Sequence, residues 1–267
     1  MTEKSVILTR DDDGIARVTL NRPGVHNAFD EGMIHDLREV IQTLEEDNHC
    51  RAVVLRGAGK SFCAGADLDW MKRAADFSHN QNLADAEYLA AMLNAFYSLN
   101  KFTIACVHGA ALGGGLGLLS CCDMVIADEN SVFALSEVKI GLIPATISPY
   151  VLAAMGERNA RRYFQTGERF GTPRAYDLGL VHEITATEDE MDEKLTEILD
   201  HVRANGPLAM REAKRLILDY AGKPLGAEMM EDSAERIAAI RARPEAREGL
   251  EAFLTKRKPD WIRRNGR

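Results

Sequence analysis

The sequence predicts an α/β protein with a mostly parallel sheet, followed by an all-helical region. Up to residue 184, short apolar runs rich in β-branched residues alternate with segments of helical periodicity. A helix between two neighbouring strands is a crossover connection, and such connections join parallel strands. After about Glu188 the strand signals stop, and helical stretches separated by prolines follow. These three observations set the fold class.

Six apolar runs have the length and composition of strands. They are Ser5–Leu8, Ile15–Leu20, Ala52–Arg56, Thr103–Val107, Met124–Ala127 and Leu180–Ile184.

Two of the intervening segments predict amphipathic helices. The first follows Asp30, a suitable N-cap because its carboxylate can accept a hydrogen bond from a first-turn amide. Its apolar stripe consists of Met33, Ile34, Leu37, Val40, Ile41 and Leu44. The second runs from about Asn82 to Leu99, and its stripe consists of Leu83, Ala86, Leu89, Ala90, Leu93, Phe96 and Tyr97.

Beyond Glu188, three or four helices are predicted. Pro207, Pro224 and Pro244 each suit a first helical turn, where the missing N–H has no intrahelical partner. The apolar stripes of these helices must cover either the core or a neighbouring subunit.

Composition excludes several classes of function. The 267 residues carry a formal charge of −8, with basic residues scattered except near the end, which argues against a nucleic-acid-binding face. The five cysteines show no C-x-x-C spacing, so reduced thiols are expected. The sequence has no signal-peptide segment and nothing near the ~20 apolar residues that span a bilayer. We expect a soluble cytoplasmic protein that binds no membrane.

Familiar catalytic motifs are incomplete or absent. "GAGKS" at Gly57–Ser61 resembles the end of a P-loop, but Val54 stands where the motif needs its first glycine. The dinucleotide pattern fails because Phe62 takes the place of its last glycine. The chain also lacks an H-E-x-x-H helix and a G-x-S-x-G elbow, so zinc-protease and α/β-hydrolase interpretations fail.

Two glycine-containing turns follow predicted strands. "FCAGADL" at Phe62–Leu68 and "ALGGGLG" at Ala111–Gly117 both leave carboxyl ends of strands, where open α/β sheets bind ligands. A turn that opens into a helix directs free N–H groups outward, so two such donors can converge on one developing oxyanion. The alternative is that Gly113–Gly115 only packs a helix against the sheet.

A single carboxylate follows these turns in an apolar context. In "FALSEVKIGLIPA", Glu137 lies among aliphatic and aromatic residues. Apolar surroundings disfavour the charged form and raise the pKa, which suits a proton carrier at neutral pH. The alternative is a solvated glutamate paired with Lys139.

These motifs together resemble the enoyl-CoA hydratase/isomerase (crotonase) superfamily over nearly the whole chain. The segments that carry the resemblance are "LNRPGVHNAF", "RGAGKSFCAGADL", "VHGAALGGGLGL", "FALSEVKIGLIP" and "EAFLTKRKPDW". Finer features, such as "LSEVKIGLIPATISPYV", are most similar to bacterial methylglutaconyl-CoA hydratases and related isohexenylglutaconyl-CoA hydratases.

The resemblance implies a spiral of ββα units over residues 1–195 and a helical trimerisation region over residues 196–267, assembled as trimers or as dimers of trimers. It implies an acyl-CoA substrate, and no metal or redox cofactor. By motif position, the amides of Ala66 and Gly114 form the oxyanion hole and Glu137 is the acid/base. The expected substrate-binding residues are His26, Ala28, Ala64, Asp67, Leu68, Gly113, Phe253 and Lys256, the last two acting across a subunit boundary if not within one chain. Asp67 is also expected to cap the following helix.

One position departs from the family pattern. Typical enoyl-CoA hydratases carry a second glutamate where this chain has Gly117, so the two-carboxylate mechanism does not transfer. Hydration by Glu137 is the leading hypothesis, with double-bond isomerisation and a catalytically silent CoA-binding role as alternatives. The second partner for water is a backbone carbonyl, Ser136, Ser120 or a group in residues 70–82.

A glutaconyl-type substrate needs a cation for its distal carboxylate. Lys72 and Arg73 lie in the right segment, and the alternative for both is a solvated helix face. His108 is interpreted as a packing residue at a strand end.

Overall fold

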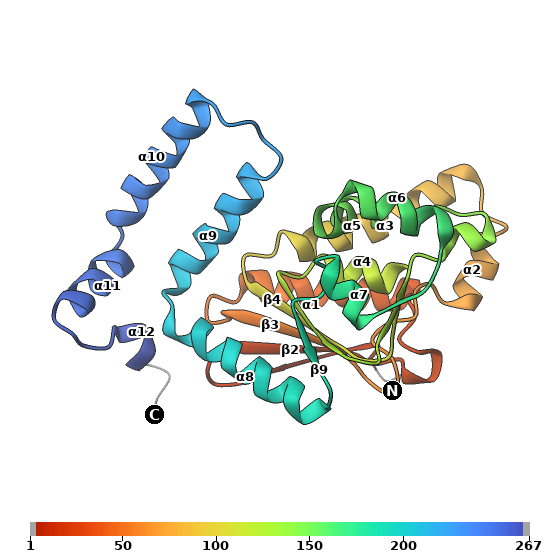
Figure 1. Cartoon of the computed structure of the whole chain (residues 1–267), viewed down its shortest axis with the longest axis horizontal. Coiled ribbons are helices and arrows are strands. Elements are labelled where there is room, and N and C mark those ends of the chain that lie inside the picture. The colour runs from red at the N-terminus through yellow and green to blue at the C-terminus, as the bar shows by residue number, and fades with distance from the viewer. Residues whose placement is uncertain (1–3, 264–267) are drawn as a thin grey trace.

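The structure is a computed structural model that describes residues 4–263. A six-stranded sheet of order β1-β2-β3-β4-β6-β9 forms its centre (Figure 1). Its strands are β1 (Val6–Arg10), β2 (Ile15–Leu20), β3 (Ala52–Gly57), β4 (Phe102–Val107), β6 (Met124–Asp128) and β9 (Glu183–Thr185). Only β1 and β2 pair antiparallel, and the other neighbours pair parallel. The predicted α/β class is confirmed.

A second, three-stranded sheet of order β5-β7-β8 was not predicted. Its strands are β5 (Ala110–Leu112), β7 (Val132–Ala134) and β8 (Phe170–Gly171). They are two or three residues long, too short for an alternating pattern to be recognised. Because β5 and β7 precede Gly113 and Glu137 by one and three residues, this small sheet fixes where both residues start.

Helices and 3₁₀ turns connect the strands and continue to the end of the described chain. They are η1 (Pro23–Val25), α1 (Glu31–Glu46), α2 (Leu68–Ala74), α3 (His79–Tyr97), α4 (Gly114–Ser120), η2 (Glu137–Ile140), α5 (Ser148–Met155), α6 (Glu157–Thr166), α7 (Thr172–Asp177), α8 (Glu188–Ala204), α9 (Pro207–Tyr220), α10 (Ala227–Arg241), α11 (Pro244–Leu254) and α12 (Asp260–Arg263). The Asp30 carboxylate accepts a hydrogen bond from the Met33 amide, which confirms the predicted N-cap of α1.

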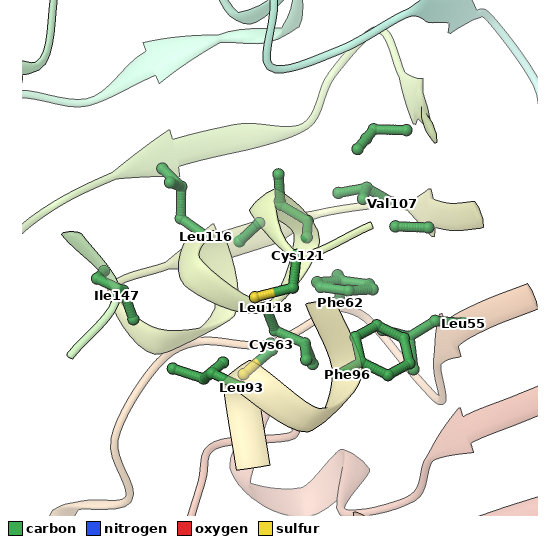
Figure 2. Close-up of a cluster of buried hydrophobic side chains, with 14 of the residues drawn as sticks. Leu55, Phe62, Cys63, Leu93, Phe96, Val107, Leu116, Leu118, Cys121 and Ile147 are labelled. Carbon is green, nitrogen blue, oxygen red and sulfur yellow. The ribbon is translucent and has the colours of Figure 1, made fainter. Parts of the chain in front are cut away.

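Alternate residues of the strands face two separate cores. Val53 and Leu55 of β3 join the larger core with α1, α3 and α4, whereas Ala52 and Val54 join the smaller core under α8. Figure 2 shows part of the larger core, in which Leu116 and Leu118 of α4 lie among buried side chains of other elements. The sheet is covered on both faces, which explains the continuous apolar runs of its parallel strands.

Two sequence expectations about the middle of the chain need correction. The strand expected at Leu180–Ile184 is shorter and later, because Leu180 and Val181 pack in the larger core before β9 begins at Glu183. Leu83 is 49% exposed, so the buried face of α3 starts nearer its C-terminal half, at Met92.

The C-terminal helices differ in how they relate to the core. Four apolar residues of α8 are buried under the sheet, so this helix packs with the core and contains the expected boundary between 195 and 196. From Pro207 onward, α9 and α10 extend side by side away from the sheet (Figure 1), joined by the ion pair of Asp219 and Arg236. Pro244 occupies a first helical turn as expected, but Pro224 lies in the loop before α10.

Within residues 4–263, no helix is both long and apolar enough to cross a membrane. The same residues hold no group of three or more His, Cys, Asp or Glu side chains arranged to bind a metal ion. All five cysteines are free thiols, as expected.

Candidate active site

The two glycine-containing turns lie against each other. Parallel bridges join Phe29 to Ala66 and Cys63 to Ala111, so the first turn is held between the loop before α1 and strand β5. Gly65 has φ +99°, and a Cβ added there would stand 3.1 Å from the Leu112 carbonyl oxygen and 3.9 Å from the Gly113 Cα. The predicted proximity of the turns is therefore present in the fold.

Ala66 and Gly114 each present a backbone amide that has no hydrogen-bond acceptor among the described residues. The Phe29 amide donates to the Gly65 carbonyl (2.7 Å) and the Asp67 amide donates to the Phe29 carbonyl (2.8 Å), so the bridge uses the residues flanking Ala66. Gly114 is the first residue of α4, and first-turn amides have no intrahelical acceptor. Free amides on adjoining turns are the elements that an oxyanion hole requires.

The three consecutive glycines serve different contacts. Gly113 has φ +50°, and a Cβ there would stand 3.0 Å from Glu137 Oε1. A Cβ on Gly114 would be 2.9 Å from the Phe29 ring, and one on Gly115 would overlap the Cys63 backbone. Gly115 thus follows the packing interpretation, whereas Gly113 permits the carboxylate to approach the turn closely.

Glu137 is the first residue of η2, directly beyond β7. Its Oε2 atom is buried and has no hydrogen-bond partner in the described part of the chain. Burial raises the pKa of this carboxyl above its ordinary value, as its apolar context predicted. Glu137 Oε2 is buried and makes no ion pair with Lys139 among these residues, so the interpretation as a solvated surface pair is wrong.

Gly117 lies one helical turn beyond Gly113, and its amide donates to the Gly113 carbonyl (3.0 Å). A Cβ added to Gly117 would overlap Cγ2 of Ile147 and stand 2.5 Å from Cβ of Ile147. The place of the family's second glutamate is therefore closed by an isoleucine that the sequence did not single out. Ser120, one suggested partner for water, donates its hydroxyl to the Leu116 carbonyl (2.8 Å) and is buried.

Three expected binding residues line the loop before α1 and the adjoining turn. The Ala64 amide donates to the His26 carbonyl (3.0 Å), and the His26 ring contacts the Ser61 hydroxyl (3.1 Å between Nδ1 and Oγ). Ala28 is buried, and its carbonyl accepts from Arg22. The His26 carbonyl, the Ala64 amide and the Ala28 carbonyl therefore all have partners within the chain.

Arg22 is a structural residue that the sequence analysis missed. Its guanidinium contacts Asp30 (2.8 Å) and Asp67 (3.0 Å), and so ties the starts of α1 and α2 together. Asp67 caps α2, as expected, through the amides of Asp69 and Trp70. Burial alone would raise the Asp67 pKa, but these amides and Arg22 lower it overall. Leu68, next along α2, is 73% exposed.

Phe253 and Lys256 do not join the other site residues within one chain. Phe253 lies at the end of α11 and is 79% exposed, and Lys256 follows it with φ +53°. Figure 1 shows α11 beyond the amino-terminal edge of the sheet, beside the projecting helices. Neither residue therefore contributes to this site from within the same chain.

The remaining candidates have structural partners. Lys72 pairs with Asp69 (2.8 Å) and Arg73 with Glu31 (2.6 Å), both on exposed surface, which favours the solvated-face interpretation. His108 contacts the Gly59 carbonyl (2.9 Å), in agreement with a packing role.

A cavity of about 560 Å³ opens between the amino-terminal edge of β4 and helices α8 and α9. None of the expected site residues lines it, and its cations are already engaged. The Lys214 ammonium, for example, bonds Asp123 (2.8 Å) and the Lys101 carbonyl (2.9 Å). This cavity is therefore separate from the predicted site at the glycine turns and Glu137.

Comparison with known proteins agrees with this geometry. The profile of the enoyl-CoA hydratase/isomerase family matches residues 10–264. An enoyl-CoA hydratase structure from Shewanella pealeana shares 42% identity over 96% of each chain, with a TM-score of 0.93. Pseudomonas aeruginosa AtuE shares 34% identity over 97% of this chain and 99% of its own, also with a TM-score of 0.93.

Bacillus subtilis YngF is 36% identical over 258 residues, which cover 95% of this chain and 96% of YngF. The residues that the family profile matches include both glycine turns, Glu137 and helices α8 to α12. The chain is a member of the enoyl-CoA hydratase/isomerase family, with the crotonase fold.

Proposed function

We propose that this protein hydrates a 2-enoyl-CoA thioester with Glu137 as its acid/base. The observation that carries the proposal is the buried Oε2 of Glu137, which has no protein partner and lies beside turns with two free amides. A carboxylate whose pKa is raised by burial can accept a proton from water near neutral pH.

The reaction begins when Glu137 removes a proton from water as the water oxygen bonds to the β-carbon. The electron pair of the double bond moves toward the thioester, and negative charge develops on its oxygen. The amides of Ala66 and Gly114 donate hydrogen bonds to that oxygen in the resulting enolate. The proton is then delivered to the α-carbon, which restores the thioester and regenerates the Glu137 carboxylate.

Isomerisation is the second candidate, and the contact of Ile147 with Gly117 favours it. Moving a double bond requires removal of one proton and its return to another carbon, which a single carboxylate can perform. Water needs orientation as well as deprotonation, and Ile147 offers no hydrogen bond for that purpose.

We infer a branched glutaconyl-type thioester, such as 3-methylglutaconyl-CoA in leucine breakdown, as the substrate class. The support is the resemblance of the Glu137 segment and two cations on α2, the helix that begins after the Ala66 turn. Lys72 and Arg73 hold carboxylates already, so a distal substrate carboxylate would replace Asp69 or Glu31 as their partner.

A matched pair of thioesters tests the reaction and the substrate class together. We expect 3-methylglutaconyl-CoA to gain the mass of one water, with a higher kcat/KM than 3-methylcrotonyl-CoA, because only the first carries a distal carboxylate that can replace Asp69 or Glu31 as a partner. Mass spectrometry distinguishes this from isomerisation of a 3-enoyl-CoA, which leaves the mass unchanged.

Two results would contradict these assignments. Equal kcat/KM for the two thioesters would refute the substrate class and leave hydration standing. Isomerisation with no water added to any 2-enoyl-CoA would replace the hydratase assignment, and absence of both reactions would favour a silent CoA-binding role.

We propose that the helical region from Pro207 onward assembles the chain as a trimer or a dimer of trimers. The support is the apolar surface of α9–α11 and their loops. Its exposed large hydrophobic residues are Ile217, Leu225, Met230, Ile237, Leu250, Phe253 and Leu254. Phe253 and Lys256 would then cover the adenine or phosphates of CoA bound to a neighbouring subunit.

Native mass determination tests the assembly. We expect three or six times the chain mass of 29.5 kDa, because a helix pair that exposes this much apolar surface is stable when another chain covers it. Leu225→Asp, at a side chain 92% exposed, should shift the distribution toward monomer. A monomer in the unmodified protein would refute the proposal.

A further inference from the structure

We propose that Ile147 determines the reaction chemistry by occupying the space that a side chain at residue 117 would need, so that Glu137 acts as the only carboxylate of the site. This inference deepens the proposed function and rests on it. Ile147 is a positioning residue, because it acts through the volume it fills and not through a bond to substrate.

Glu137 and Ile147 both lie against the same face of α4. Gly117 follows Gly113 by one turn, and the hydrogen bond between them shows that this turn is helical. Glu137 Oε1 lies against Gly113, and Ile147 lies against Gly117, so the carboxylate and the isoleucine are neighbours along that face. Residues four apart on a helix are close enough for side chains to share one environment.

Ile147 is held firmly in this place. It is 2% exposed and occupies the N-cap position of α5. Figure 2 shows it beside α4 in the larger core, together with Leu116 and Leu93. A well-packed core does not yield easily to an added atom, so Gly117 cannot gain a side chain while Ile147 keeps its position.

The chemical consequence is a site with one titrating group. An aliphatic side chain neither donates nor accepts hydrogen bonds, so Ile147 can neither hold nor deprotonate water beside Gly117. Glu137 must both take the proton from water and return it to carbon. A second carboxylate at residue 117 would couple to Glu137 and add a second ionisation to the pH profile.

The steric part is tested by Gly117→Ala. Helix propensity alone predicts that alanine raises Tm, whereas overlap with Ile147 predicts that it lowers Tm. Gly32 in α1 is the matched control, because a Cβ there meets only Asp30 Oδ1 at 3.5 Å. We expect Gly32→Ala to raise Tm and Gly117→Ala to lower it, and a rise in both would overturn the exclusion.

Removing the overlap with a side chain at residue 117 requires glycine at residue 147. Ile147→Ala would leave its Cβ 2.5 Å from a Cβ at residue 117, so alanine is insufficient. We expect Gly117→Ala to lower Tm less in an Ile147→Gly background than in the unmodified chain. Glycine is acceptable at a helix N-cap, so this background keeps the capping geometry of α5.

The claim that Glu137 is the only carboxylate of the site is tested by comparing Gly117→Glu with Gly117→Gln, both combined with Ile147→Gly. The two proteins differ only in a carboxylate against an amide. We expect the glutamate protein to show a ratio of hydration to isomerisation about tenfold or more above that of the glutamine protein. Its kcat/KM profile should also show one additional ionisation on the acid side.

The outcomes separate this inference from the proposed function. If both double variants fold and share one product ratio and one pH profile, residue 117 does not face the site and the inference fails. If the unmodified protein neither hydrates nor isomerises, the proposed function fails, while the Tm comparison still decides the steric exclusion. Should the double variants not fold, Gly117→Ala decides the steric exclusion. The kcat/KM profile of the unmodified protein, expected to show a single ionisation on the acid side, then decides whether Glu137 is the only carboxylate.

Discussion

Glu137→Gln is expected to lower kcat by roughly 10²–10⁴-fold while making the folded chain more stable at neutral pH. The amide has nearly the shape of the carboxyl group but cannot accept a proton from water. The carboxylate, in contrast, keeps one buried oxygen without a partner, and an unsatisfied buried charge destabilises the fold. Turnover of the 2-enoyl-CoA and urea unfolding at pH 7 measure the two effects.

The pH dependence follows from the raised pKa of Glu137. The folded protein binds this proton more tightly than the unfolded chain, whose glutamate titrates near 4.5. The contribution of this carboxyl group to the stability of the fold is therefore fully present below about pH 4.5. It is lost as pH rises through the pKa of Glu137 in the folded protein. We expect the stability advantage of Glu137→Gln, on the order of 1 kcal/mol at pH 7, to disappear as pH falls toward 4.

Glu87→Gln is the control for this comparison, because Glu87 is an exposed residue of α3 outside the site. Both its activity and its unfolding curve should match those of the unmodified protein. A Glu137→Gln protein with undiminished turnover would show that the acid/base lies elsewhere. A lower stability at pH 7 would show that the carboxylate has a favourable partner in solution.

Ala66→Pro is expected to lower kcat by about 10²–10³-fold with little change in fold. Proline removes the backbone N–H that would stabilise the enolate oxygen, and this N–H donates to no acceptor among the described residues. Ala66 is exposed, so the ring has room toward solvent. Steady-state kinetics give the effect on kcat, and circular dichroism with Tm reports on folding.

Glu188→Pro provides a matched proline substitution. Glu188 is the first residue of α8, a position where proline is tolerated because its N–H has no intrahelical acceptor. It should leave kcat unchanged. A folded Ala66→Pro protein with the same kcat as Glu188→Pro would remove Ala66 from the oxyanion hole.

Much of the fold is recognisable from local sequence because local rules determine it. β2 has the predicted bounds, and β3, β4 and β6 extend the predicted runs by one residue. The caps at Asp30 and Asp67 are confirmed because a carboxylate three residues before a helical amide forms its bond without help from the rest of the chain.

Contacts between segments far apart in the chain leave no local sequence pattern from which they could be predicted. Arg22 looks like any surface arginine in the sequence, yet it contacts both Asp30 and Asp67, the second of which lies 45 positions further along the chain. The small sheet of β5, β7 and β8 assembles segments too short to show periodicity. Pro224 suits the first turn of a helix, but α10 begins only at Ala227.

The sequence by itself determined the alternation of strands and helices, the glycine-containing turns and the apolar context of Glu137. Each depends on residues close together in the chain, whose backbone preferences and burial follow from their own pattern. Only the tertiary structure decided that Glu137 lies against Gly113 and that Ile147 closes the space beside Gly117. Both contacts join segments far apart in the chain, and they depend on how those segments pack in the folded protein.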